Sequence, residues 1–408
     1  MERLTLATAE RAAAPTVPGS AAALATTADR PTDPHAVRDV VRAAIDRGTR
    51  LRIVGRGTWL DAGRPVTNAT PVALDGLTGI VDYTPGDLTL TARAGTTLGE
   101  IATATAANGQ WLSLTPWGGD AGSLGATAAT ASSGPLSGAL GTPRDVIIGL
   151  EAVTGAGDVV RGGGRVVKNV AGFDLTRLMI GAWGTLGVLT EISVRLRGLP
   201  ERDLTVALPL PATAALGDFL TRLRSAPITP IALELVGATL ARRIGAGSEG
   251  TLLARLAGNE PSVSAQREAL AAMGDITEIG ADVWQKLRAA EPTSSSVVRL
   301  SSSVARFADA WGAAERVAGA VPGGFAHATL QRSVARVVLP NGPNGLVTGA
   351  ADALRSIARE TRIFERLPAS EWQAFAPSAV TDNLSRGVRD AFDPDRLLNP
   401  GILGEDPS

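Results

Sequence analysis

Three glycine-rich segments in the N-terminal half of the chain have the composition of a phosphate cradle. They span residues 53–58, 118–126 and 181–187. Because glycine has no side chain, backbone N–H groups in such segments can approach a pyrophosphate closely, and successive N–H groups form a nest for an anion. Each segment taken singly is more typical of a turn. Three of them, with strands predicted between, favour a site for a phosphate-bearing cofactor.

The spacing of these glycines argues against the two common nucleotide-binding loops. A Rossmann turn needs Gly-x-Gly-x-x-Gly between a first strand and a helix. Here Gly55 and Gly57 are followed by no third glycine at the required place and by no helical pattern. A Walker motif is also absent, because no glycine-rich loop runs into Gly-Lys-Ser or Gly-Lys-Thr.

Cysteine and histidine are scarce, which narrows the possible chemistry. The chain has no cysteine and only two histidines. It therefore holds no disulfide, thiolate zinc site, cysteine nucleophile or iron–sulfur cluster, and no metal site is predicted. A redox role would need an organic cofactor, with one-electron relays in a partner. His327 is the candidate general base, since the pKa of histidine suits that role, but a hydrogen-bonded strand histidine is the alternative. His35 is expected at the surface.

Arg299 is the candidate contact for a substrate carboxylate. It lies in a strand-like stretch, and its planar guanidinium can form paired hydrogen bonds to a carboxylate. An ion pair with Glu234 or another acid, in a scaffold role, is equally open. Arg332 and Arg336 are weaker candidates of the same kind.

Composition bounds the remaining possibilities. The 408 residues are 44% hydrophobic, which predicts two or three domains. With a net charge of −1, the chain has no basic excess to neutralise a nucleic-acid backbone. No run of about 18 apolar residues predicts a transmembrane helix. Residues 1–20 lack the apolar core of a secretory signal and are expected to form a loose tail.

The elements that must position these residues form two groups. Helices are predicted at 31–47, where an apolar stripe ends at Gly48, and at 97–108. Strands are predicted at 21–28, 51–54, 74–77, 79–83, 88–92, 146–153, 158–160 and 187–197. After Pro200 the order strand–helix–strand occurs twice, over 204–236 and 251–280, which is typical of a ferredoxin-like cap. Later strands are predicted at 297–301, 324–329 and 334–339, with helices at 345–359 and 386–392.

Two longer runs carry a family likeness. Residues 163–175 read Gly-Gly-Arg-Val-Val-Lys-Asn-Val-Ala-Gly-Phe-Asp-Leu, and residues 181–191 read Gly-Ala-Trp-Gly-Thr-Leu-Gly-Val-Leu-Thr-Glu. Together they resemble the FAD-binding signature of the vanillyl-alcohol-oxidase, or PCMH-type, flavoproteins. The tail at 392–401, Phe-Asp-Pro-Asp-Arg-Leu-Leu-Asn-Pro-Gly, is similar to the closing motif of the 2-hydroxy-acid oxidase branch. Within that branch the chain looks most like the smaller flavin-domain subunits of bacterial glycolate oxidases.

The resemblance implies an α+β fold with two lobes. A PCMH-type FAD-binding domain would span 15–198, a ferredoxin-like cap that faces substrate or partner would span 199–384, and residues 385–408 would return to the FAD domain. The resemblance places cofactor contacts on the glycine segments, the stretch between them and the tail. The residues concerned are Gly55, Arg56, Gly57, Thr58, Pro116, Gly122, Ser123, Leu124, Gly125, Ser132, Gly134, Gly184, Thr185, Gly187, Val188 and Asn399.

Several positions depart from the catalytic members of the branch. Those chains carry a cap motif of the form His-x-Gly-Asp-Gly-Asn-x-His, whereas residues 325–330 here contain His327 alone. Trp183 stands where they have glutamate. Trp117 and Trp183, both in glycine-rich turns, could flank an aromatic ring or pack the loops. Because no His or Cys lies beside the first glycine segment, the FAD is expected to be non-covalent.

These features predict an FAD-binding subunit of a glycolate oxidase complex. The partners would be a second, catalytic flavin-domain subunit and an iron–sulfur subunit, and the substrate would be glycolate or a similar small 2-hydroxy acid. Two alternatives remain open: a stand-alone FAD-dependent D-2-hydroxy-acid dehydrogenase, and a scaffold subunit without flavin. The expected location is cytoplasmic, with peripheral attachment at the inner membrane through partners also open.

Overall fold

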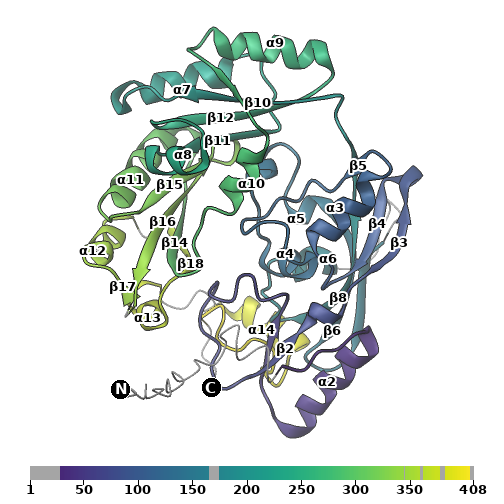
Figure 1. Ribbon diagram of the computed structural model, residues 1–408. Helices are drawn as coiled ribbons and strands as arrows, with labels where there is room; N and C mark the ends of the chain where they lie inside the picture. Colours follow the sequence, from purple (N-terminus) through teal and green to yellow (C-terminus); the bar gives the residue numbers. More distant parts are fainter. Residues whose placement is uncertain (1–27, 165–173, 344, 359–361, 377–381, 405–408) are drawn as a thin grey trace, which may run out of the picture.

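The computed structural model shows two lobes that face each other (Figure 1). It describes residues 28–164, 174–343, 345–358, 362–376 and 382–404. Both lobes combine helices and sheet, which confirms the predicted α+β class. The predicted first strand lies almost wholly outside the described residues, as does the stretch 165–173 of the first signature run.

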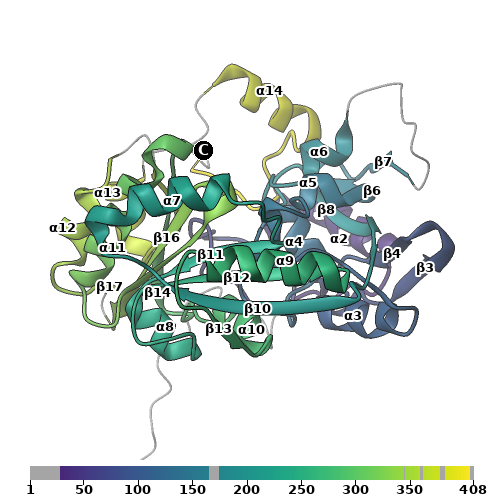
Figure 2. The same cartoon turned by 90° about the horizontal axis from the view of Figure 1, so that it is seen from above.

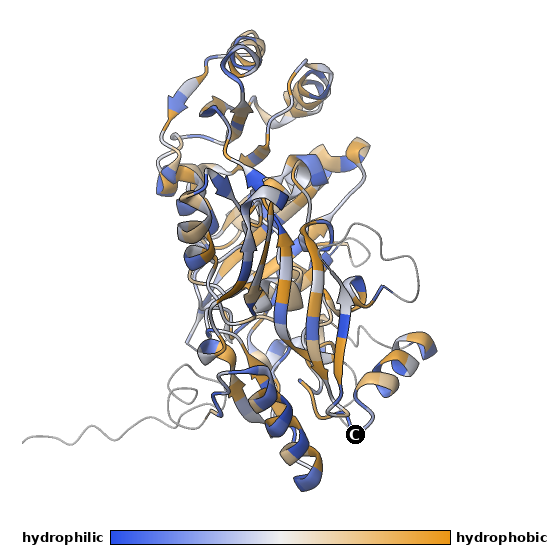
Figure 3. Ribbon diagram, turned by 90° about the vertical axis from the view of Figure 1, so that its right-hand side faces the viewer, coloured by the Kyte–Doolittle hydropathy of each residue, from blue (hydrophilic) through white to orange (hydrophobic). Residues whose placement is uncertain are grey.

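A five-stranded antiparallel sheet, in the order β3-β4-β8-β6-β7, organises the first lobe. Its strands are β3 (Ile80–Thr84), β4 (Thr89–Arg93), β6 (Ile147–Thr154), β7 (Val159–Gly163) and β8 (Gly187–Arg195). Hydrophobic stretches run along these strands (Figure 3). The central strands are buried because α2 (Pro34–Arg47) packs on β6 and β8 while α4 (Leu124–Thr130) packs on β4 and β8. Shorter elements complete the lobe: β5 (Gln110–Trp111), α5 (Pro143–Val146), α6 (Leu175–Met179) and β9 (Arg197–Gly198).

The two helices predicted in this lobe form where their capping residues place them. The side chain of Asp33 accepts a hydrogen bond from the backbone N–H of Ala36 and starts α2, which ends at Gly48 in the left-handed conformation. Thr97 and Glu100 form a capping box that starts α3 (Leu98–Ala106). Both helices turn their apolar residues toward the core of the lobe.

The cap contains a nine-stranded sheet made of two ferredoxin-like units placed side by side. The first unit runs β10 (Arg202–Pro209), α7 (Leu216–Ser225), β11 (Ala232–Val236), β12 (Thr251–Gly258), α9 (Glu260–Ala271) and β13 (Thr277–Ile279). The second runs β14 (Ser295–Ser301), α11 (Phe307–Gly319), β15 (Phe325–Thr329), β16 (Val334–Gly342), β17 (Gly345–Leu346), α12 (Ala350–Arg355) and β18 (Arg362–Arg366). The units join where β11 pairs with β15. The ferredoxin-like cap predicted from the repeated strand–helix–strand pattern is therefore confirmed.

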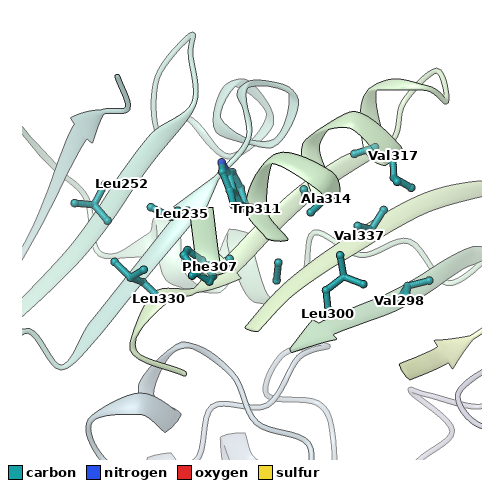
Figure 4. Close-up of a cluster of buried hydrophobic side chains, with 14 of the residues drawn as sticks. Leu235, Leu252, Val298, Leu300, Phe307, Trp311, Ala314, Val317, Leu330 and Val337 are labelled. Atoms are coloured by element: carbon teal, nitrogen blue, oxygen red, sulfur yellow. The ribbon is translucent and has the colours of Figure 1, made fainter. Parts of the chain in front are cut away.

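Opposite faces of the cap sheet carry different helices. α7, α9 and α11 cover one face, where their apolar side chains pack on the strands; Figure 2 shows α7 and α9, and Figure 4 shows Phe307 and Trp311 of α11. α8 (Ala238–Ile244) and α10 (Asp282–Arg288) lie on the other face. Sequence analysis missed α11 and predicted one helix at 345–359, where the structure has β17 followed by the shorter α12.

The two lobes share a hydrophobic cluster. Trp117 and Leu136 of the first lobe pack with Trp284 and Leu287 of α10 in the cap. The C-terminal tail follows α13 (Trp372–Phe375) and α14 (Asn383–Phe392) and returns to the first lobe, where the backbone N–H of Leu51 donates to the carbonyl of Leu397. Within the described residues, no helix has the length and apolar character needed to cross a membrane.

Candidate functional site

A groove in the first lobe collects residues from all three glycine-rich segments and from the tail. Its empty space of about 990 Å³ includes the open mouth of the groove. We call it the cofactor groove. Of the sixteen residues predicted to contact the cofactor, eleven line this groove: Gly55, Arg56, Gly57, Thr58, Pro116, Gly122, Ser123, Gly125, Ser132, Gly184 and Asn399.

The first glycine segment leaves β1 (Leu51–Val54), a short strand that pairs in parallel with β2 (Thr70–Ala73). Gly57 has a φ of 74°, a conformation that favours glycine. A Cβ atom on Gly55 would lie 2.7 Å from Oγ of Ser123 in the second segment. The two segments approach so closely because glycine occupies position 55, and this leaves backbone as one wall of the groove.

The third segment and the C-terminal tail meet at Asn399. Its side-chain oxygen accepts a hydrogen bond of 2.8 Å from the N–H of Ile53, and its side-chain nitrogen donates one of 2.7 Å to the carbonyl of Trp183. Trp183 has a φ of 54°, which is uncommon for a bulky residue. Asn399 is 2% exposed and thus fixes the first and third segments relative to each other.

Five of the predicted contacts do not line the groove and instead pack in the surrounding structure. Leu124 and Val188 are core residues, and Gly187 lies in β8 opposite Thr154. The hydroxyl of Thr185 donates to the carbonyl of Ala182. Gly134 packs against the carbonyl of Thr115, where a Cβ atom would not fit.

The groove contains polar groups that suit a phosphate-bearing cofactor. The buried hydroxyl of Ser132 has no hydrogen-bond partner within the described residues. Arg52, on β1, also lines the groove, and burial alone lowers its pKa to about 10. Arg52 has no acidic partner among the described residues, and a partly buried cation of this kind gains from a neighbouring anion, as FAD phosphates would supply. Arg52 was missed from the sequence because it lies inside a predicted buried strand.

A second cavity lies between the groove and the cap sheet. We call it the cap cavity; three tryptophans, Trp59, Trp117 and Trp183, line both it and the cofactor groove. From the cap, Arg299, Arg332 and Arg336 line it, together with Glu365. The tryptophans therefore stand where a ring bound in the groove would meet the cap cavity, as expected if they flank an aromatic group.

The arginines of the cap cavity differ in how fully they are paired. Nε of Arg336 lies 2.8 Å from Glu291, and its Nη1 lies 2.7 Å from Glu365. Arg299 pairs with Glu365 at 3.5 Å, rather than with Glu234, and its Nε is buried without a hydrogen-bond partner. Arg299 is thus the less engaged of the two. Arg332 also lines the cavity.

His327, the candidate base, lies on β15 behind the wall of the cap cavity. Its side chain is fully buried, with Nε2 3.4 Å from Glu291, Nδ1 3.9 Å from Glu234, and its ring against the indole of Trp117 at 4.5 Å. Burial lowers the pKa of His327, but the two carboxylates raise it by more than burial lowers it. The pKa of His327 therefore lies above its ordinary value. The imidazole is therefore favoured in its protonated form.

Glu291 links His327 to the seam between the lobes. It binds Arg336 with one oxygen and Arg366 with the other, at 2.8 Å each. Although burial raises its pKa, Arg336 and His327 lower it more strongly, to well below its ordinary range. Arg366 also pairs at 3.3 Å with Asp61, which follows the first glycine segment. Within the described residues, no group of three or more acidic or histidine side chains is arranged to hold a metal.

Comparisons with known proteins identify the family of the chain. Residues 26–163 match the model of the FAD binding domain family. Glycolate oxidase subunit GlcE of Escherichia coli is 36% identical over 256 residues, which cover 62% of this chain and 68% of that protein. Glycolate oxidase subunit GlcD of Bacillus subtilis is 42% identical over 106 residues, which cover 26% of this chain and 23% of that protein.

Solved structures support the fold. A structure of p-cresol methylhydroxylase with substrate bound superposes with a TM-score of 0.73 at 17% identity and covers 92% of this chain and 88% of that one. At this identity the likeness concerns the fold alone. The matches to the FAD binding domain family and to subunit GlcE show that the chain belongs to the PCMH-type family of FAD-linked oxidoreductases and that its cofactor is FAD.

Proposed function

We propose that this chain is an FAD-binding accessory subunit of a glycolate oxidase complex. The complex oxidises glycolate or a similar small 2-hydroxy acid to the 2-oxo acid, and electrons pass to an iron–sulfur partner chain. A second flavin-domain subunit carries the main substrate chemistry. Similarity to subunit GlcE supports this assignment, and the chain has no cysteine with which to bind a cluster of its own.

The cofactor groove performs the binding part of this function. Backbone N–H groups of the glycine segments and the cation Arg52 would hold the phosphates, while Trp117 and Trp183 would flank the ring. When bound, FAD supplies a redox group that can accept and pass on electrons. Neither His327 nor His35 lines the groove, so the proposal includes non-covalent FAD.

The residues of the cap cavity are the main support for an accessory role of this subunit. Oxidation of a 2-hydroxy acid needs a base near the hydroxyl and a cation near the carboxylate. Arg299 can serve as the cation, but the base is missing: the described residues that line the cavity include no histidine or lysine, and their one carboxylate, Glu365, already pairs with Arg336 and Arg299. Fully buried His327 does not reach the cavity.

The runner-up is a stand-alone D-2-hydroxy-acid dehydrogenase. It is favoured by one observation, that Arg299 and Arg332 line a cavity next to the cofactor groove and could clamp a substrate carboxylate. In that case His327 would have to reach the cavity after Trp117 moves aside. A flavin-free scaffold is disfavoured by the match of the chain to FAD-binding relatives and by the form of the groove.

Location is part of the proposal. We place the subunit in the cytoplasm. Any attachment to the inner membrane would then be made by the partner chains. Fractionation of native cells with and without the partner chains tests this. Subunit that stays with the membrane after the partners are deleted would contradict it.

A dye-linked assay tests the division of labour. The chain alone and the chain co-expressed with the second flavin subunit and the iron–sulfur subunit are each given glycolate or D-lactate and an artificial electron acceptor. We expect turnover by the complex and little by the single chain. Full turnover by the single chain that is lost in His327→Ala would establish the stand-alone dehydrogenase instead.

A further inference from the structure

One loop of the cofactor groove is held from both lobes. The loop spans residues 116–122 and is here named the groove loop; Gly118 and Gly119 have φ values of 97° and 83°. On the side of the FAD-binding lobe, the first N–H groups of α3 hold it, since Leu98 donates to the carbonyl of Gly122 and Gly99 to that of Asp120. Because α3 binds only the end of the loop, the start of the loop needs a second support.

The second support comes from the cap, at the last residue of α10. The carbonyl of Arg288 accepts a hydrogen bond of 2.9 Å from the N–H of Gly118. Its Nε donates one of 2.9 Å to the carbonyl of Pro116. Its Nη2 lies 2.7 Å from Oδ1 of Asp120, as an ion pair outside hydrogen-bond geometry. Arg288 thus contacts the groove loop at three residues, Pro116, Gly118 and Asp120.

Arg288 is itself fixed in the cap. Val283, Trp284 and Leu287 of α10 are buried in the cluster that the lobes share, and the indole N–H of Trp284 donates to the hydroxyl of Thr205 on β10. Only 6% of Arg288 is exposed, so its guanidinium stays in one place. The position of the groove loop is therefore coupled to the position of the cap sheet.

From these contacts we infer that Arg288 is a positioning residue for FAD, through which the cap sets the shape of the groove loop and hence the affinity for the cofactor. Pro116, Gly118 and Gly119 line the cofactor groove, so a change in the loop changes the surface that FAD meets. Consecutive left-handed glycines have many alternative conformations when unsupported. The planar fork of arginine holds two loop atoms at once, which lysine cannot reproduce.

The test measures FAD affinity of the full-length protein after removal of its flavin. FAD is titrated into Arg288→Ala, Arg288→Lys and Asp120→Asn while flavin fluorescence is followed, and thermal unfolding is recorded for each flavin-free protein. Arg267→Ala is the matched control, because Arg267 is a cap arginine whose ion pair with Glu278 is exposed. We expect Arg288→Ala to bind FAD at least about tenfold more weakly, because the charge-assisted hydrogen bond to Pro116 and the ion pair with Asp120 are lost. Arg288→Lys should recover only part of that loss.

Comparison of affinity with stability separates positioning from general structural support. A purely structural residue would lower the unfolding temperature of the flavin-free protein and leave the affinity of its folded fraction unchanged, which would overturn the inference. If Arg288→Ala does not fold, Asp120→Asn decides, since 46% of the Asp120 side chain is exposed and its change spares the core. We then expect about threefold weaker binding; FAD affinity equal to that of Arg267→Ala would contradict the role of the cap. The outcome is independent of whether the chain alone oxidises a substrate.

Discussion

Replacement of Asn399 by alanine should lower both the stability of the fold and the affinity for the cofactor. Its side chain makes two hydrogen bonds with backbone groups of Ile53 and Trp183, at 2.8 and 2.7 Å, and is 2% exposed. Asn399→Ala leaves both backbone groups buried without a partner, at about 1–3 kcal/mol each. Asparagine also tolerates the φ of 44° at this position better than alanine does. Some relaxation will offset these terms.

We therefore expect Asn399→Ala to lower the free energy of unfolding by about 2–4 kcal/mol. Because Asn399 joins the first and third glycine segments, FAD affinity should fall by an order of magnitude or more. Urea unfolding of the flavin-free protein and titration with FAD measure the two effects. Asn108→Ala is the control, since Asn108 is an exposed residue at the end of α3. Stability and FAD affinity equal to those of the control would refute the role assigned to Asn399.

A second substitution at this position tests the direction in which stability changes with pH. Asn399→Asp keeps the acceptor for the N–H of Ile53 but places a carboxylate oxygen against the carbonyl of Trp183. Protonation of the new carboxyl would remove the repulsion and restore a donor. Its pKa should therefore be raised, and the variant should regain stability as the pH falls. Stability that declines along with the wild type toward acid pH would contradict this geometry.

Three further outcomes follow from the site. Gly57→Val, at a φ of 74°, should abolish flavin retention while the unfolding of the cap is unchanged, as judged by flavin content and circular dichroism. Acid precipitation of the FAD-loaded protein should leave the flavin in the supernatant; yellow pellets would mean a covalent bond. Stability should fall as the pH drops below 4.5, because Glu291 has a lowered pKa in the folded protein and protonation breaks its ion pair with Arg336. Stability should also fall as the pH rises past 6.5, because His327 has a raised pKa in the folded protein and loses its charge there. Urea unfolding of His327→Gln should lack the second loss and show a smaller first loss, because His327 also lowers the pKa of Glu291.

The sequence predicted the architecture because local signals agreed with the fold. Asp33 and Gly48 mark both ends of α2, and the repeated strand–helix–strand order identified the first ferredoxin-like unit. The helix α11 was missed although Phe307, Trp311 and Ala314 form its buried stripe. Its N-cap, Arg306, makes no side-chain cap, and a short 3₁₀ turn precedes it, so no start signal marks it.

The site was only partly predictable, because its remaining contacts join distant parts of the chain. Glycine segments identified the groove, but the tie of Asn399 to Trp183 spans 216 residues and that of Arg288 to Pro116 spans 172. Such partners leave no local spacing pattern. The surroundings of His327 were hidden for the same reason, since Glu234 and Glu291 come from separate elements and meet only when the cap sheet forms.

Anaerobic mixing of the isolated FAD-loaded chain with glycolate tests the central claim most directly. The flavin absorbance reports whether this chain itself takes electrons from the substrate, with no acceptor needed. We predict that the flavin of the isolated chain stays oxidised, because the described residues that line the cap cavity include no free base. We also predict that the flavin is bleached when the second flavin subunit and the iron–sulfur subunit are present. Rapid bleaching of the isolated chain by glycolate would contradict the accessory role.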